Sequence, residues 1–221
     1  MKFENTEVYG FARALHGMRN PLESWTKNDT VEENGKVIIG PNDLKLCQRL
    51  ILSGSEHRKF MRQIMVSVDI TAPLYWWKEF DTYKVGTVAN STSTMHKLAS
   101  TPITLECFEI DDYDASLTYG EKKLDEVLAA HIEFLEEMRV KYLKTQDKRY
   151  WKELIRWLPS SWNQTRTVTM TYENLLAMCS KGQRRFHKLT EWSLSFIGWA
   201  RTLPYAQELL FIDEVTDGAE K

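Results

Sequence analysis

The chain has 221 residues, of which 43% are hydrophobic and 27% are charged, with a formal net charge of −2. This composition excludes a disordered chain, and the length suits one globular domain over residues 1–221. A near-neutral charge and a pI of about 6.2 exclude a global positive field, so neither nucleic acid nor a membrane is expected as a partner.

The N-terminus and the cysteines indicate the compartment and the chemistry to expect. Residues 1–5 have no apolar run after their charges, and no later segment approaches the length of a membrane span, so we expect a cytoplasmic protein. Cys47, Cys107 and Cys179 are odd in number and far apart, which leaves no disulfide framework and no CxxC site. The five histidines show no close ligand spacing, so no metal is expected.

Apolar periodicity predicts the elements of the first half of the chain. A helix is expected over residues 8–18, followed by a loop that contains Asn34-Gly35. Another helix is expected to place Leu44, Cys47, Leu50 and Ile51 on one face. Apolar and polar residues then alternate over 64–70, which predicts a strand, and a helix opens near Pro73.

The second half of the chain is expected to be mostly helical. Residues 86–102 are rich in Thr, Ser and Asn and predict a loop or a bent strand. Leu124 to Tyr142 form a long amphipathic pattern, typical of a scaffold helix. The remaining expected elements are a helix over 148–158, a strand over 166–170, helices around 175–178, 189–199 and 205–211, and a frayed tail over 213–221. The order of elements indicates an α/β (α+β) fold.

Aromatic residues are numerous, with eight Trp, nine Tyr and nine Phe. Some of them cluster, as in Tyr75-Trp76-Trp77. Such residues favour a core or a subunit interface, and a pocket for a flat ring stays open as the alternative.

Two polar segments could bind an anion. In the first, Lys84-Val85-Gly86 precedes hydroxyl groups and Asn90, a cation with neutral donors that suits a phosphate, or else a surface loop. In the second, Arg184 and Arg185 follow Gly182 in an expected turn. Their guanidinium groups could reach a carbonyl or phosphate, or could simply interact with a helix dipole.

The first segment resembles the flavin-dependent thymidylate synthases, also called thymidylate synthase complementing proteins. Members of that family carry an Ala-Pro helix that ends in Arg-Gln, then Arg-His-Arg, then Asn-Glu-x-Ser-x-Arg-Tyr. Here Ala72-Pro73 match, Glu79 replaces the Gln, and Thr82-Tyr83-Lys84 replace Arg-His-Arg. Asn90 and Ser93 match the Asn and Ser if one residue is inserted.

The second segment resembles the C-terminal signature of the same family, a Leu-Pro, a strand, a helix starting Asn-x-Arg-x-Leu, a terminal Arg, and His-Ala-Gln-x-Glu. Leu158-Pro159 fits, and Thr171, Glu173 and Leu175 take the Asn, Arg and Leu positions. Arg184 is similar to the terminal Arg, and residues 187–191 to the His-x-x-x-Glu. The chain is thereby identified as a divergent member of the family.

The resemblance implies an α/β fold with a mixed β-sheet and flanking helices, assembled as a homotetramer with active sites shared between subunits. It implies a methyltransferase that converts dUMP to dTMP with methylenetetrahydrofolate, FAD and NADPH. The cofactors do the bond-making, so no nucleophilic side chain is required. A related pyrimidine-nucleotide-modifying enzyme, such as one performing 5-hydroxymethylation, and a non-catalytic nucleotide-binding descendant remain as alternatives.

The resemblance also implies roles for individual residues. Arg184 would orient the pyrimidine and stabilise charge on it, as the catalytic residue. His57 falls near a family histidine beside the flavin and folate, with a longer spacing to Ala72. The implied cofactor-binding set is Thr82, Tyr83, Lys84, Asn90, Thr171 and His57, and the implied substrate-binding set is Glu79, Thr92, Ser93, Arg156 and Arg184.

Two departures from the family concern arginines. The family uses its Arg-His-Arg triplet for flavin contacts and its Arg-Tyr pair for the substrate phosphate. Thr82-Tyr83-Lys84 and Met95-His96 stand at these positions. A single lysine does not reproduce the planar fork of a guanidinium group.

Overall fold

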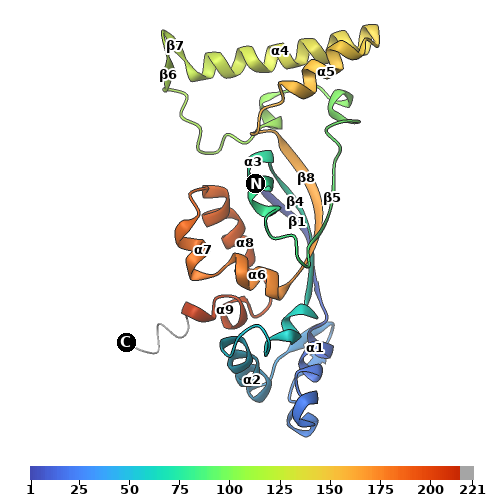
Figure 1. Cartoon of the computed structure of the whole chain (residues 1–221), viewed down its shortest axis with the longest axis vertical. Coiled ribbons are helices and arrows are strands. Elements are labelled where there is room, and N and C mark those ends of the chain that lie inside the picture. The colour runs from blue at the N-terminus through green and yellow to red at the C-terminus, as the bar shows by residue number, and fades with distance from the viewer. Residues whose placement is uncertain (215–221) are drawn as a thin grey trace. The chain divides into compact units, whose positions relative to one another are not determined.

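The chain forms two compact units in a computed structural model that describes residues 1–214 (Figure 1). The first unit comprises Met1–Lys2, Ile70–Glu79 and Asn90–Arg166, and the second comprises Phe3–Asp69, Phe80–Ala89 and the described part of Thr167–Lys221. The single domain over 1–221 stays a prediction. Residues 215–221 of the predicted frayed tail lie outside the described residues.

Four strands form the main sheet, in the order β1-β4-β8-β5. They are β1 (Lys2–Tyr9), β4 (Met65–Pro73), β5 (Val88–Ser91) and β8 (Asn163–Thr171). Strands β4 and β8, which the sequence predicts, run through both units. The predicted α/β fold class is confirmed.

Hydroxyl pairs show how β4 and β8 are aligned. The Oγ of Ser67 lies 2.8 Å from Oγ1 of Thr169, and the Oγ1 atoms of Thr71 and Thr165 lie 2.7 Å apart. The residue number rises on one strand as it falls on the other, so the two strands are antiparallel. Val66, Val68 and Ile70 on β4 are fully buried, as the predicted alternation requires.

The N-terminus departs from the prediction. The expected helix over residues 8–18 begins only at Phe11, as α1 (Phe11–Gly17), because residues 2–9 form β1. Contacts with β4 hold this strand, including Asn5 Nδ2 donating to Asp69 at 2.8 Å. Gly10, with a φ of 96°, joins the strand to the helix, a conformation that glycine adopts readily.

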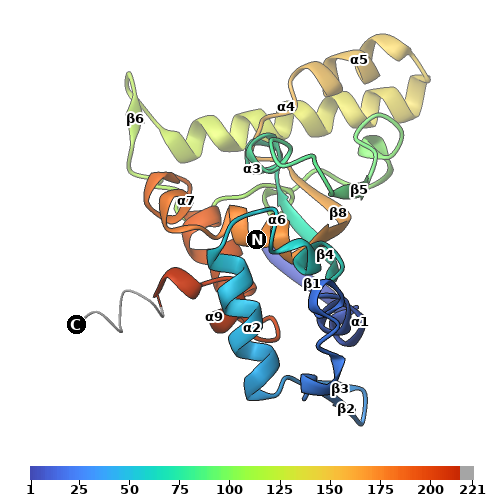
Figure 2. The same cartoon turned by 60° about the horizontal axis from the view of Figure 1, so that its bottom comes forward.

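A short hairpin occupies the expected loop around Asn34-Gly35. Strands β2 (Val31–Glu33) and β3 (Lys36–Ile38) pair with Val31 opposite Ile38. Figure 2 labels both strands of this hairpin, which comes directly before α2 (Pro41–Leu52) in the chain. Asn34 and Gly35 both have positive φ values, 52° and 73°. This is the backbone that an Asn-Gly dipeptide favours in a two-residue hairpin turn.

The C-terminal part of the second unit is helical. Its helices are α6 (Tyr172–Met178), α7 (Lys181–Phe186), the π-helix Glu191–Phe196, α8 (Ile197–Ala200) and α9 (Ala206–Leu209). The expected helix over 189–199 is therefore partly a π-helix. The expected turn at Gly182 is wrong, because these residues lie on α7. Buried aromatic rings, including Trp192, Phe196 and Phe211, form the core beneath these helices.

A helical pair dominates the first unit. The predicted scaffold helix is α4 (Leu124–Thr145), and α5 (Lys148–Arg156) lies alongside it in both views (Figures 1 and 2). Leu135 of α4 and Leu154 of α5 are fully buried against Phe108. The unit also contains the strands β6 (Thr118–Tyr119) and β7 (Lys122–Lys123).

The aromatic cluster after β4 lies on α3 (Leu74–Phe80) and confirms the core interpretation for two of its three members. Trp76 and Trp77 are no more than 1% exposed. Several 3₁₀ turns complete the described chain, at Asn20–Leu22, Trp25–Lys27, Lys59–Arg62, Leu98–Ser100 and Leu105–Cys107. Within residues 1–214, no helix combines the length and apolar character needed to cross a bilayer.

Candidate functional site

The start of α6 brings together segments that are far apart in the sequence. Thr171 caps this helix, and its side chain and that of Asn174 form a reciprocal capping box. The Nδ2 atom of Asn174 also donates to the carbonyl of Val85 at 2.5 Å. Asn174 therefore contacts both Thr171 and Val85, and Val85 directly follows the predicted cofactor residues Tyr83 and Lys84.

Gly86 allows this approach. Its φ is 81°, and a Cβ atom placed on it would lie 3.1 Å from Oδ1 of Asn174. A side chain would strain the backbone and crowd the amide that holds the loop. The Lys84-Val85-Gly86 sequence is thus suited to a loop that passes close to α6.

A second link to α6 comes from the segment that contains His57. The Nε atom of Arg58 donates to Oε1 of Glu173 at 3.1 Å, and Nε of Arg62 donates to Oε2 of the same carboxylate. Burial alone would raise the pKa of Glu173, but the hydrogen bonds from Arg62 and Arg58 hold that pKa below its usual value. The carboxylate is therefore ionised at neutral pH and ties residues 58–62 to α6.

Aromatic stacking positions Tyr83. Its ring lies 5.5 Å from that of Trp192, tilted by 31°, and His187 stacks on Trp192 at 4.0 Å with an interplanar angle of 3°. The first and second polar segments thus contact each other within the second unit. Thr82 and Lys84, on either side of Tyr83, are exposed.

His57 lines a large cavity of the second unit, with a volume of about 1090 Å³. Five cationic residues line this cavity, Arg19, Lys27, Lys45, Arg49 and Lys59, and Arg19 among them is buried and paired with Asp43. Apolar groups that include Leu46, Leu50 and Phe60 line it as well. The combination suits a large ligand with both a flat apolar part and negative charge.

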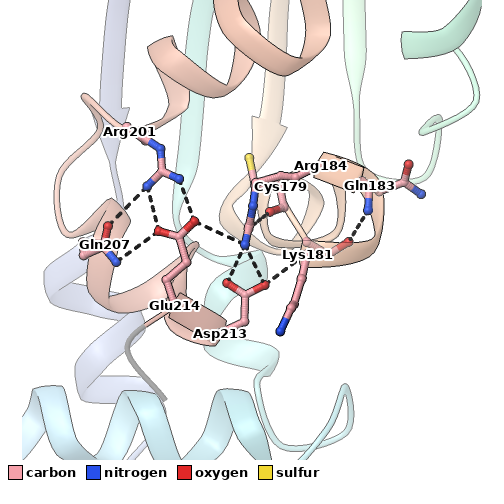
Figure 3. Close-up of polar contacts among 9 residues, drawn as sticks. Cys179, Lys181, Gln183, Arg184, Arg201, Gln207, Asp213 and Glu214 are labelled. Atoms are coloured by element: carbon pink, nitrogen blue, oxygen red, sulfur yellow. Dashed lines mark hydrogen bonds and ion pairs between the residues drawn. The ribbon is translucent and has the colours of Figure 1, made fainter. Parts of the chain in front are cut away.

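Arg184 belongs to an ion-pair network with the end of the described chain (Figure 3). Its Nη2 lies 3.1 Å from both carboxylate oxygens of Asp213 and 3.3 Å from Glu214, and its Nη1 donates to the carbonyl of Cys179. Glu214 also pairs with Arg201 at 2.7 Å. Both guanidinium groups lie over the ring of Phe211, at 5.4 and 4.0 Å.

The predicted residues of the first unit lie on several elements, and Thr92 and Ser93 come directly after β5. The amide of Thr92 donates to the carbonyl of Thr165 at 2.9 Å, and Gln164 Nε2 donates to the carbonyl of Thr92 at 2.8 Å. The Oγ of Ser93 accepts from the amide of His96 at 3.0 Å. Asn90 is exposed on β5, as is Glu79 on α3. Arg156 pairs with Glu153 on α5.

Sequence reasoning missed four residues that organise these contacts. In the first unit, Gln164 accepts from Nε of Arg166 at 3.0 Å while holding Thr92. In the second unit, Arg58 and Arg62 hold Glu173. The four-residue spacing of Arg58 and Arg62 is the only sequence signal for that pair.

Two of the three cysteines, Cys47 and Cys179, are buried as thiols. Burial raises the pKa of the Cys47 and Cys179 thiols to about 12, so neither is a thiolate near neutral pH. Among residues 1–214, no three His, Cys, Asp or Glu side chains are grouped as metal ligands. The contacts described above involve hydroxyl, amide, guanidinium and aromatic groups.

The fold is that of the flavin-dependent thymidylate synthases. The crystal structure of the flavin-dependent thymidylate synthase ThyX from Helicobacter pylori, complexed with FAD and dUMP, has a TM-score of 0.67 at 16% identity, covering 96% of this chain and 99% of that one. A second Helicobacter pylori ThyX structure with FAD and dUMP gives 0.64 at 16% identity, covering 94% and 95%. The sequence matches no protein-family model and no curated protein. The predicted resemblance is confirmed at the level of the fold.

Proposed function

We propose that the chain is a flavin-dependent thymidylate synthase-like enzyme that converts dUMP to dTMP with FAD, methylenetetrahydrofolate and NADPH. The observation that carries this proposal is the convergence on α6 of the segments containing His57, Tyr83-Lys84 and Thr171. The resemblance implies that all three contact the flavin. The solved structures with the same fold contain FAD and dUMP.

The residues of the second unit fit a flavin. The cavity beside His57 has the volume for a tricyclic ring with its side chain, and its cationic wall suits phosphate groups. His57 and the cavity wall would hold the flavin, with Tyr83, Lys84 and Thr171 around it. The chemistry that FAD supplies when bound is hydride transfer.

The residues of the first unit fit a nucleotide. Thr92 and Ser93 present hydroxyl groups on a backbone that Gln164 and Thr165 hold in place. Hydroxyl groups on a fixed backbone can donate to a phosphate or a pyrimidine carbonyl without reorganisation. In this proposal Asn90, Thr92 and Ser93 orient dUMP and FAD, with Glu79 and Arg156 completing the implied polar set.

The protein as purified tests this proposal. We expect a yellow protein with a flavin absorption spectrum, a homotetramer by light scattering, and dTMP formation from dUMP with the two cosubstrates. The wild-type protein should rescue the growth of a thymidine-requiring bacterium. At equal soluble expression, at least one of the variants Ser93→Ala and Thr92→Ala should fail to do so. A protein that binds FAD and dUMP but forms a different pyrimidine product would replace the synthase proposal with the modifying-enzyme alternative.

Arg184 needs its own test, because its two roles predict different results. The resemblance assigns it to the pyrimidine, whereas its contacts tie it to Asp213 and Glu214. If it orients the pyrimidine, Arg184→Lys should lower kcat by about 100-fold or more, since one preorganised donor at a developing charge is lost. If it only anchors residues 213–214, Arg184→Lys should lower stability and leave kcat of the folded enzyme unchanged.

A further inference from the structure

Two guanidinium groups converge on one carboxylate at the start of α6. Arg58 and Arg62 both donate to Glu173, and the terminal Nη2 of Arg62 also donates to the carbonyl of Ser55 at 3.3 Å. These contacts join residues that are more than 110 positions apart in the chain, since Arg62 and Glu173 are separated by 111. The cluster is therefore built by the tertiary structure of the second unit.

The cluster keeps a surplus of positive charge and of donors. Arg58, Lys59 and Arg62 carry three positive charges, against the two carboxylates of Glu56 and Glu173. Each guanidinium group has five N–H donors. Within residues 1–214, neither Nη1 of Arg62 nor the terminal nitrogens of Arg58 have a hydrogen-bond partner. The Arg62 side chain is 52% exposed and that of Arg58 is 26% exposed, so a ligand can reach them.

The cluster lies next to the loop in which the family's Arg-His-Arg triplet is replaced by Thr82-Tyr83-Lys84. Glu173 stands where the family signature has an Arg, and its neighbour Asn174 holds the loop of Lys84-Val85-Gly86. That loop follows the Thr82-Tyr83 pair that replaces part of the Arg-His-Arg triplet. The charge of the helix position is thus reversed here, and two arginines from residues 58–62 occupy the space beside it.

We propose that Arg58 and Arg62 form a phosphate-binding fork, held in place by Glu173, which replaces guanidinium groups missing from residues 82–84. The ligand group is a phosphate or pyrophosphate, of the flavin or of the nucleotide substrate, and this assignment rests on the proposed function. A guanidinium group binds two phosphate oxygens through a planar fork, which a lysine does not reproduce. Glu173 lowers the cost of ordering both arginines, because it fixes them before the ligand arrives.

Paired ligands with and without phosphate test the fork. Binding of FAD against riboflavin, and of dUMP against deoxyuridine, is measured by titration calorimetry on the full chain, its Arg58→Lys variant and its Arg62→Lys variant. We expect each substitution to weaken a phosphate-bearing ligand by about tenfold and to leave its phosphate-free partner unchanged. A loss confined to FAD assigns the fork to the flavin, and a loss confined to dUMP assigns it to the substrate.

Arg149→Lys is the matched control, because Arg149 also pairs with a carboxylate, that of Asp147, but on the exposed surface of the first unit. It should leave all four affinities unchanged. Wild-type affinities for FAD and dUMP in both fork variants would overturn the proposal, and so would equal losses for riboflavin and deoxyuridine, which would indicate a structural role.

Inorganic pyrophosphate tests phosphate binding by Arg58 and Arg62 independently of the proposed synthase function. If the wild-type protein binds neither flavin nor nucleotide, the synthase proposal fails, and stabilisation by pyrophosphate becomes the readout. A rise in Tm with pyrophosphate that disappears in the Arg58→Lys, Arg62→Lys double variant supports the fork. A wild-type Tm that does not respond to pyrophosphate, in a protein that binds none of the four ligands, overturns it.

Discussion

The second unit contains two arginine clusters that differ in charge balance. Arg58 and Arg62 share the single carboxylate of Glu173, and Arg62 is about half exposed. Arg184 and Arg201 face two carboxylates, Asp213 and Glu214, and the Arg184 side chain is only 17% exposed (Figure 3). The first cluster has charge left for a ligand, whereas the second is neutralised by the protein itself.

This difference indicates whether an arginine stabilises the fold or is available to bind an anion, even in a structure without a ligand. A guanidinium group whose donors are taken by protein carboxylates and carbonyls contributes mainly to stability, because a ligand must first displace those partners. A guanidinium group that is oriented by one carboxylate and keeps open donors is preorganised for an anion. The contrast adds Arg58 and Arg62 as expected anion contacts, and the role of Arg184 at the pyrimidine stays a prediction.

The largest effect is expected from removing the neutralised arginine. Arg184→Ala leaves Asp213 without its guanidinium partner and should lower the free energy of unfolding by about 2 kcal/mol, measured by urea denaturation. The neighbouring Arg185, exposed on the same helix, supplies the control, and Arg185→Ala should change stability by less than about 0.5 kcal/mol. Equal stability losses for the two variants would remove the distinction between the clusters.

A smaller effect is expected at the cap that positions Glu173 and Asn174. Thr171→Ala removes the side-chain acceptor for the amide of Asn174 and should cost about 1 kcal/mol of stability. Because α6 carries Glu173, the same change should also weaken the phosphate-bearing ligand in the fork test. Thr171→Ser keeps the hydroxyl group and should restore both properties. If Thr171→Ala lowers stability but leaves FAD and dUMP affinities intact, the cap does not position the fork.

The smallest effect on the free energy of unfolding is expected from lowering the pH. Hydrogen bonds from Arg201 hold the pKa of Glu214 below its usual value although burial raises it, and the pKa of Glu173 is lowered as well. A carboxyl group with a depressed pKa in the folded state contributes stability above its unfolded pKa, near 4.5, and loses it as the pH falls through the folded pKa. Stability should therefore fall as the pH drops below about 4.5 and the two carboxylates become protonated.

Two glutamine variants sharpen the pH comparison. Glu173→Gln and Glu214→Gln should each flatten the acid part of the stability curve, measured by urea denaturation at several pH values. Glu137→Gln, which alters an exposed pair within α4, should leave the curve unchanged. A wild-type slope in Glu214→Gln would show that its ion pairs contribute nothing to acid stability.

Local pattern in the sequence determined several elements by itself. The alternation over 64–70 predicts β4, and the apolar period from Leu124 predicts α4, because each element buries one face and solvates the other. Asn34-Gly35 contains the turn chemistry of a hairpin, although the flanking residues are too polar to indicate its strands. The ordered family motifs predicted the fold that the solved structures confirm.

The tertiary structure alone decided which arginines are neutralised and which keep open donors. Whether Arg184 meets a ligand or a carboxylate depends on Asp213, 29 positions away, and the pairing of Arg58 with Glu173 spans 115 positions. The strand β1 was missed for the same reason, because its stability comes from pairing with β4 rather than from its own residues. Charge pairing and strand pairing depend on distance in space, and one sequence without its fold does not contain those distances.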